Sequence, residues 1–394
     1  MSMATIKLSE TTKFIVDNRG KTVPTADTGI PLIATNCIDN KNLYPVYEKL
    51  RYVSEDTYDN WFRSHPKPMD IILTLKGSQN GAVNLVPDPV DFCIAQDMVA
   101  LRVDETKIDN LYLFAALRSE DIQDQIKTLD VSGVIPHFKK SDFDKLEIPL
   151  PPRSLQEFIG KTYFDLCNKI DLLHRQNKTL EAMAETLFRQ WFIEEAKEDW
   201  PVKPLKEICQ IINGFAFKSG SYTDSGYKVI RTLNFTNHKL DTNQLVYVSE
   251  DTAKEYEKYN LQRKDFLLVM VGASLGNYAI VTKDALPALQ NQNMWCFRAF
   301  DDCYQNFLNH RLLDVIEENL SGASGSAREF FQKSVFYEVT IAVPPNELLE
   351  AYNVEADVLF NKMELNRDQI QTLEKLRDTL LPKLISGEVK LKWD

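Results

Sequence analysis

The side chains in this sequence whose types and spacing could do chemistry are cationic and amide side chains in short polar stretches after predicted strands. The clearest stretch is KGSQNG at residues 76–81, which follows the apolar run DIILTL and carries Lys76, Ser78, Gln79 and Asn80. In the DNA major groove, lysine or arginine pairs with guanine, and asparagine or glutamine pairs with adenine. The stretch therefore has the chemistry to read base edges, although each residue would also suit an ordinary solvated turn.

Similar side chains recur in other predicted loops. The stretch GASLGN at residues 272–277 carries Ser274 and Asn277. The other candidates fall into three groups. Near the lobe starts lie Arg19, Lys21, Lys218, Ser219 and Tyr222, after predicted strands lie Asn36, Arg231, Thr232 and Asn234, and ahead of the first double proline lie Lys139 and Lys140. In an interface of this kind most contacts would hold phosphates and position the protein, and only a few would specify sequence.

Catalytic patterns are missing from the sequence. RGKT at residues 19–22 resembles the end of a phosphate-binding loop, but Ile15 stands where that motif needs glycine. We find no G-x-G-x-x-G, no Asn/Asp-Pro-Pro-aromatic tetrapeptide and no C-x-x-C, and the five histidines are scattered. We therefore expect a protein without catalytic residues, metal or cofactor.

Composition narrows the class further. The net charge of −11 argues against a protein that coats nucleic acid, so loops or a partner would have to supply positive charge around DNA. No apolar stretch is long enough to span a bilayer, and the first residues lack the apolar run of a signal peptide. Together with unclustered cysteines, this predicts a cytoplasmic protein that does not enter a membrane.

The sequence is built from one unit that occurs twice. YVSEDT stands at residues 52–57 and again at 247–252. FKKSDFDKLEIPLPP (138–152) aligns with FQKSVFYEVTIAVPP (331–345), and the offset between matching segments stays between 193 and 196 residues. A constant offset with conserved order indicates an internal duplication.

Each copy is predicted to be a mixed α/β lobe followed by a long helix. We expect lobes at residues 1–150 and 199–343 and helical segments at 151–198 and 344–394. Short Ile-, Leu- and Val-rich runs bounded by Gly, Asn, Asp and Pro are typical of strands, without the regular alternation of a doubly wound sheet. The fold class is therefore α+β, and each lobe ends at a double proline, which cannot continue a sheet ladder.

The two predicted helices carry apolar residues at alternating steps of three and four. The first seam runs through Leu166, Ile170, Leu173, Asn177, Leu180, Ala184, Leu187 and Trp191, and the second through Leu359, Met363, Asn366, Ile370, Leu373, Arg377, Leu380 and Leu384. This pattern predicts an antiparallel coiled coil in which one asparagine per seam fixes register. The alternative is that each helix packs only on its own lobe.

A coiled coil of this length would act as a ruler. Forty helical residues span roughly 60 Å at ~1.5 Å per residue. A DNA turn is about 34 Å, so lobes at the two ends of such a rod would suit a target read in two parts.

Large apolar residues stand at the ends of the two predicted helices. The end of the first helix carries Phe188, Trp191 and Phe192, and the end of the second carries Leu381, Leu384 and Ile385. We expect them either to dock partner subunits or to close the core of a lobe.

Three stretches resemble a known family. IPLPPRSLQEFIGKTYFDLCNKIDLLHRQNKTLEAMAETLFRQWF (148–192) is similar to the central conserved region of DNA-specificity subunits of type I restriction–modification systems. LEKLRDTLLPKLISGEVKL (373–391) resembles their distal conserved region, and INGFAFKSGSYTDSGYKVIRTLNF (212–235) resembles the opening of a target-recognition domain. The resemblance covers essentially the whole chain, although the second joint, NELLEAYNVEADVLF (346–360), is degraded relative to the first.

The resemblance implies a subunit without chemistry of its own. Two modification subunits would bind S-adenosylmethionine and methylate adenine in each half of a split double-stranded DNA target, and the assembly allows for restriction (motor–nuclease) subunits. Each lobe would read one half-site, and the coiled coil would set the spacer. Because the lobes differ at most loop positions, we expect two different half-sites. The alternatives are a specificity subunit that serves a stand-alone methyltransferase, and a pseudo-symmetric scaffold that binds proteins without DNA specificity.

Overall fold

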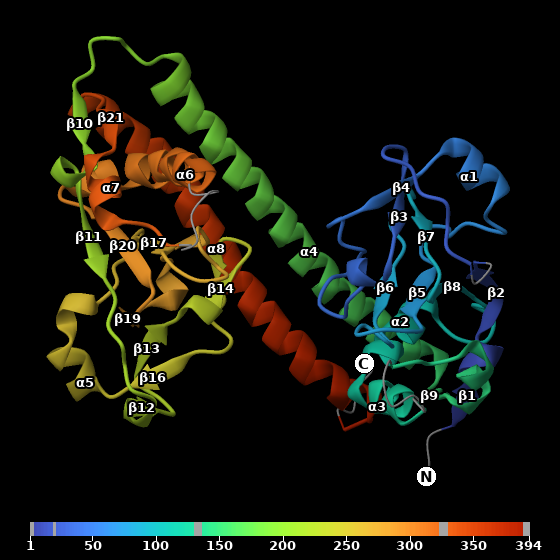
Figure 1. Cartoon of the computed structure of the whole chain (residues 1–394). Coiled ribbons are helices and arrows are strands. Elements are labelled where there is room, and N and C mark those ends of the chain that lie inside the picture. The colour runs from blue at the N-terminus through green and yellow to red at the C-terminus, as the bar shows by residue number, and fades with distance from the viewer. Residues whose placement is uncertain (1–3, 19–20, 130–135, 323–329, 389–394) are drawn as a thin grey trace. The chain divides into compact units, whose positions relative to one another are not determined.

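A computed structural model describes residues 4–18, 21–129, 136–322 and 330–388. The chain folds as two compact units, formed by residues 1–175 with 369–394 and by residues 176–368. The two long helices, α4 (Arg153–Arg189) and α8 (Asn346–Ile385), each contribute a segment to both units. Each unit therefore holds one mixed α/β lobe and part of both helices (Figure 1).

The first unit is built on a four-stranded antiparallel sheet of order β2-β8-β5-β6. A three-stranded sheet of order β4-β3-β7 and a pair β1-β9 complete it. The strands are β1 (Thr5–Lys7), β2 (Thr12–Asp17), β3 (Ile30–Ile33), β4 (Arg51–Val53), β5 (Ile71–Thr74), β6 (Val83–Leu85), β7 (Cys93–Ile94), β8 (Met98–Val103) and β9 (Glu147–Pro149). The short helices are α1 (Glu55–Asn60), α2 (Asn110–Arg118) and α3 (Glu120–Thr128).

The second unit repeats this plan. Its four-stranded sheet has the order β11-β20-β17-β18, and the second sheet has the order β12-β16-β13-β19. The strands are β10 (Val202–Pro204), β11 (Cys209–Asn213), β12 (Tyr222–Thr223), β13 (Tyr227–Ile230), β14 (Phe235–Thr236), β15 (Lys239–Leu240), β16 (Val246–Val248), β17 (Phe266–Val269), β18 (Tyr278–Ile280), β19 (Ala288–Gln290), β20 (Met294–Ala299) and β21 (Thr340–Ala342). Its short helices are α5 (Glu250–Glu255), α6 (Gln305–Gly322) and α7 (Lys333–Glu338).

The internal duplication is confirmed in atomic detail. In the two copies of YVSEDT, the serine hydroxyls of Ser54 and Ser249 cap short helices by accepting hydrogen bonds from the backbone N–H groups of Thr57 (3.1 Å) and Thr252 (3.2 Å). In both units a buried aspartate forms an ion pair with an arginine. Arg102 pairs with Asp70 at 2.8 Å, and Arg298 pairs with Asp265 at 2.5 Å. The two sequence copies therefore form the same hydrogen bonds and ion pairs in the two units.

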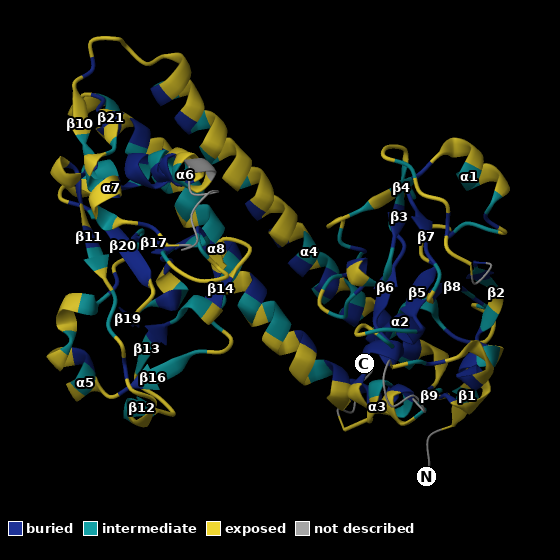
Figure 2. Ribbon diagram, viewed as in Figure 1, coloured by how far each residue is buried: buried dark blue, intermediate teal, exposed yellow. Residues whose placement is uncertain are grey.

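The cores lie where the predicted strands run through each lobe. All four residues of β5 and of β17 are buried, because each strand has neighbours on both sides within its sheet (Figure 2). Burial of such Ile-, Leu- and Val-rich strands is the main driving force for folding, at about 25 cal/mol per Å² of apolar surface. In each unit the four-stranded sheet is the scaffold from which the polar loops project.

The predicted coiled coil is confirmed, and its two helices are antiparallel. In the first unit, Ile170 and Leu173 of α4 pack against Ile370 of α8. In the second unit, the later part of α4 meets the earlier part of α8, where Asn177 contacts Asn366. Both helices begin just after a double proline, as expected for residues that cannot extend a strand.

Candidate functional site

The loop between β5 and β6 holds the polar stretch 76–81 away from the sheet. Gly77 and Gly81 have φ values of +93° and +84°, a backbone region that other residues rarely adopt. Ser78 and Gln79 are exposed at the tip, whereas Lys76 and Asn80 are half-buried. The glycines therefore turn the chain so that two hydrogen-bonding side chains face solvent.

The loop between β17 and β18 has the same backbone in the second unit. Gly272 and Gly276 take φ values of +89° and +82°, and the Gly276 N–H donates to Val269 O at 3.0 Å, as the Gly81 N–H donates to Thr74 O at 2.9 Å. Its side chains differ, however. Ser274 is exposed and Asn277 is half-buried.

Tertiary structure brings further polar residues to the first of these loops. A β-bridge joins Lys76 to His137, so Lys139 and Lys140 follow in the chain directly beside it. Both lysines are exposed, and Lys140 forms an ion pair with Asp17. A hollow of about 390 Å³ opens here, and its lining includes Lys140, His137, Arg63 and Gln96.

Sequence reasoning missed Arg63, Gln96 and His137. They come from three segments that share no motif and no common spacing, and only the fold brings them together. The hollow offers cationic, amide and imidazole groups beside two carboxylates, those of Asp17 and Asp97. This mixture of donors and acceptors suits base edges.

The strand-end candidates separate into exposed and structural residues. Asn36 is exposed, and its amide nitrogen lies 3.3 Å from Glu48 O. Arg231 and Thr232 are half-buried at the start of the short helix 232–234. Asn234 is buried, its side-chain oxygen accepts from the Arg231 N–H at 2.9 Å, and its amide nitrogen donates to Gln244 O at 3.1 Å.

The prediction that Asn234 contacts DNA is therefore corrected. Both ends of its side chain hydrogen-bond to the backbone of its own loop, so the residue is structural. The sequence shows only an asparagine after a strand, and it does not show where that asparagine points.

The remaining candidates lie on other loops. Lys21, Lys218 and Ser219 are exposed. Tyr222 is half-buried in β12, where its ring packs on a small apolar cluster. Arg19 lies outside the described residues.

The prediction of an apolar docking surface is also corrected. Phe188 and Phe192 are buried in the core of the second unit with Trp191 packed against it, and Leu381, Leu384 and Ile385 are buried in the core of the first. Side chains exposed by only 4–7% have no surface to offer a partner. The alternative expectation, that they close the lobe cores, is the one observed.

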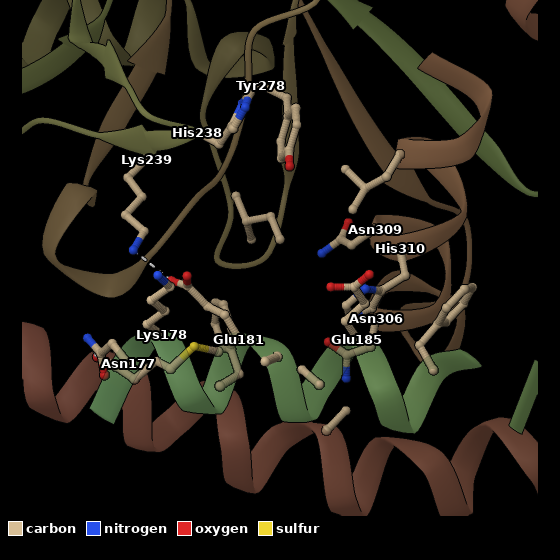
Figure 3. Close-up of a pocket in the computed structure, with 18 of the residues that line it drawn as sticks. Asn177, Lys178, Glu181, Glu185, His238, Lys239, Tyr278, Asn306, Asn309 and His310 are labelled. Carbon is tan, nitrogen blue, oxygen red and sulfur yellow. Dashed lines mark hydrogen bonds and ion pairs between the residues drawn. The ribbon is translucent and has the colours of Figure 1, made fainter. Parts of the chain in front are cut away.

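The second unit contains a large cavity that the sequence did not predict. Its volume is about 800 Å³, and it lies between α4, α6, α8, the β14–β15 turn and β18. Figure 3 shows Glu181 and Glu185 projecting into it from α4, with His310 and Asn309 opposite on α6. Lys239, the first residue of β15, forms a 2.7 Å ion pair with Glu181 across one side.

Aromatic and acidic groups give this cavity its electrostatic character. His238 stacks on Tyr278 with ring centroids 4.2 Å apart, and His310 stacks on Phe188 at 5.0 Å. Burial lowers the pKa of His310 to about 4, so its ring is neutral near pH 7. Burial, followed by the carboxylates of Glu181 and Glu185, raises the pKa of the Tyr278 phenol. The lining also carries four cationic side chains, those of Lys178, Arg189, Lys239 and Arg367, and Lys239 already neutralises Glu181. The charge of the cavity is therefore mixed, and Glu185 is the carboxylate that could receive a further cation near the flat rings.

The described part of the chain holds no group of three or more His, Cys, Asp or Glu side chains that could bind a metal ion. No helix in those same ranges is long and apolar enough to cross a membrane. The candidate loops of the two units therefore offer hydrogen-bonding and charged side chains, and both loops project from the same kind of four-stranded sheet.

Comparison with known proteins gives consistent matches. Residues 21–182 and 197–375 match the family model described as the Type I restriction modification DNA specificity domain. The chain is 25% identical over 344 residues to the type I restriction enzyme MjaVIII specificity subunit of Methanocaldococcus jannaschii, covering 82% of this chain and 80% of that relative. It is 24% identical over 319 residues to the MjaIX specificity subunit of the same organism, covering 71% and 69%. The crystal structure of the type I restriction–modification S subunit from M. genitalium superposes with a TM-score of 0.63 at 17% identity, covering 98% of this chain and 96% of that one, which shows a shared fold.

Proposed function

Since this chain belongs to the family of type I restriction–modification DNA specificity subunits, we propose that it reads a DNA target in two separate halves, with one half bound by each lobe. Specificity subunits of type I systems recognise DNA and are non-catalytic. The proposal concerns how this particular chain divides the reading between its lobes.

The matched pair of loops at 76–81 and 271–276 carries the proposal. Their glycines share one backbone conformation, so the two lobes present the same turn. Their side chains differ, because Lys76, Gln79 and Asn80 are replaced by Val271, Ser274 and Leu275. One scaffold with two sets of donors and acceptors is what two unlike half-sites require.

The length of the helices supports a fixed spacer between the half-sites. α8 runs for 40 residues, with Pro382 in its last turn, which corresponds to roughly 60 Å at ~1.5 Å per residue. In our proposal the helix pair sets the number of unread base pairs, and the lobes contact the flanking sequence.

The proposed assembly contains two modification subunits and leaves room for restriction subunits. A chain with an internal repeat can offer two related surfaces to two identical partners. Partners would also supply the positive charge that a chain of net charge −11 lacks. We place the assembly in the cytoplasm, with the DNA.

The test is methylation mapping in a host that lacks adenine methylation. The chain is produced with its neighbouring modification subunit, and the genome is sequenced for N6-methyladenine. We expect a split motif with a constant gap and unlike halves, and replacement of one lobe by that of a relative should change one half only. Identical inverted halves would contradict the two-site proposal. A soluble complex that methylates nothing would favour a protein scaffold instead.

A further inference from the structure

The cavity of the second unit lies where the first unit is filled by its own side chains. Three residues fill the core of the first unit at the matching place: Arg118, Tyr163 and Arg377. The repeat offset of 195 residues, which also relates buried Leu117 to buried Leu312, relates Arg118 to Leu313. The helix offset of 193 relates Tyr163 to Ala356 and Arg377 to Ala184. Leu313, Ala356 and Ala184 all line the cavity.

The two arginines of the first unit show what this place binds. The Arg118 guanidinium donates to Val83 O at 2.9 Å and also to Asn42 O, and it lies 4.4 Å above the Phe114 ring. The Arg377 guanidinium donates to the Asp378 carboxylate at 2.7 Å and reaches Lys41 O at 3.5 Å. Both arginines are buried, so the first unit encloses two cations among carbonyls and a ring, and Arg377 pairs with a carboxylate that is itself exposed.

The second unit keeps the groups that receive these cations. Glu185 stands at the position of Asp378 by the helix offset, and it projects into the cavity (Figure 3). Tyr278 stands at the position of Val83, and the two residues have the same register on their neighbouring strand, opposite Leu268 and Leu73.

The turn that receives the arginines is also retained. An offset of 197 residues relates buried Leu43 to buried Leu240, and it places His238 and Lys239 at the positions of Lys41 and Asn42. Both residues line the cavity. The second unit has therefore lost the two arginines and the tyrosine, and Asn309 stands at the position of Phe114. It retains the turn and the acidic position of Glu185, its rings come from His238 and Tyr278, and its own cations in the lining include Arg189 and Arg367.

We propose that the cavity of the second unit binds the guanidinium group of an arginine side chain presented by a protein partner. Glu185 would accept from the guanidinium, as Asp378 does in the first unit, and the stacked rings of His238 and Tyr278 would provide a flat neighbouring surface. A volume of about 800 Å³ exceeds one guanidinium, so the cavity also has room for the residues on either side of the arginine. The inference does not depend on how the lobes read DNA.

The experiment measures the binding affinity of a blocked pentapeptide, Ala-Ala-Arg-Ala-Ala, for the full chain by isothermal titration calorimetry. The same peptide with lysine or citrulline in place of arginine is the matched probe. Because the fork of the guanidinium suits carboxylates and rings better than an ammonium group does, we expect the arginine peptide to bind at least about tenfold more tightly than either. Equal binding of the lysine peptide, or no binding of any peptide, would overturn the proposal.

Two variants locate the bound group. Glu185→Gln should weaken the binding of the arginine peptide by about tenfold, because a charged hydrogen-bond acceptor is lost. Glu194→Gln, an exposed carboxylate nearby in the chain that does not line the cavity, should leave binding unchanged. An equal effect of both variants would mean a non-specific charge response and would contradict the site.

A cavity-filling variant completes the test. The double variant Ala184→Arg with Leu313→Arg introduces arginines at the two positions of the second unit that match Arg377 and Arg118. It should abolish peptide binding, while circular dichroism should report an unchanged fold. Should this combination fail to fold, Ala356→Tyr alone fills part of the same volume and should weaken binding. Undiminished binding in a folded filled variant would exclude the cavity. If free arginine amide binds as tightly as the peptide, the cavity is a site for a small molecule, and the proposal of a protein partner is overturned.

Discussion

The side-chain amide of Asn366 donates a 2.8 Å hydrogen bond to the side-chain oxygen of Asn177, and both residues are buried between α8 and α4. The Asn177 amide reaches Met363 O at 3.4 Å. One turn earlier in α4, Leu173 packs against Ile370. At these two levels of the seam, amide meets amide and apolar side chain meets apolar side chain.

The internal repeat makes this matching selective. The helix offset of 193 residues relates Leu173 to Asn366 and Asn177 to Ile370. Two copies of α4 in the same arrangement would place Leu173 of one opposite Asn177 of the other, which buries an amide against hydrocarbon. The seam therefore favours the pairing of unlike halves within one chain.

Replacing one asparagine of the pair should destabilise the protein more than replacing both. Asn177→Leu removes one of the two acceptors of the buried Asn366 amide, which also donates to Gln176 Oε1 at 2.9 Å, and places a leucine against it, at a cost of about 1–3 kcal/mol. The double change Asn177→Leu with Asn366→Leu should recover most of this loss, because two apolar groups then face each other. Urea unfolding of the four members of the cycle measures the coupling. Leu172→Asn, at an exposed position of the same helix, serves as the control, and a single variant as stable as the parent would contradict the role of the pair.

Gln79 should help specify only one half of the target. Gln79→Ala removes an exposed amide from the tip of the β5–β6 loop, and loss of a good bidentate base contact costs about 1–3 kcal/mol of discrimination. Methylation mapping should show relaxed sequence in one half-site, with the other half unchanged. Gln262→Ala, at an exposed position of the second unit, should leave both halves intact. Relaxation of both halves by Gln79→Ala would argue against separate reading by the lobes.

Asn234 and Asn36 should behave differently although both follow a strand. Asn234→Ala removes hydrogen bonds to the backbone of Arg231 and Gln244 in a buried loop and should lower the free energy of unfolding by about 1–3 kcal/mol. Asn36→Ala alters an exposed side chain and should change stability by less than about 0.5 kcal/mol. Thermal unfolding of both variants measures the difference. A neutral Asn234→Ala would return that residue to the set of DNA-contact candidates.

His310 should make stability depend on pH in the acid range. Burial lowers its folded-state pKa from 6.5 to about 4, so folding favours the neutral ring. Its contribution is then complete above pH 6.5 and is lost as the pH falls from 6.5 towards 4, to a maximum of about 3 kcal/mol at 1.36 kcal/mol per pKa unit.

The measurement compares the parent with His310→Phe, which keeps an aromatic ring on Phe188. Free energies of unfolding at pH 7 and pH 4.5 should differ less in the variant than in the parent. The carboxylates titrate in both proteins, so they cancel in the comparison. An identical pH dependence in the two proteins would show that His310 is solvated in the folded state.

Local patterns in the sequence determined the architecture. The repeated YVSEDT, the double prolines and the three-and-four spacing of Leu173, Asn177 and their counterparts each depend on neighbours within a few residues, so the sequence alone predicted two lobes, two helices and an asparagine in each seam. The resemblance of the helical segments to specificity subunits came from the same stretches. The turn glycines also marked the loops that carry Gln79 and Ser274.

Tertiary structure decided which side chains have a surface. Phe188 and Leu381 have the composition of a docking patch, but residues distant in the sequence cover them, and burial by distant segments leaves no local signal. Arg63 and His137 meet at one hollow for the same reason. The cavity beside Glu185 required both kinds of information. The repeat supplied the correspondence of Arg377 to Ala184, and only packing shows that the first unit fills this volume while the second leaves it open.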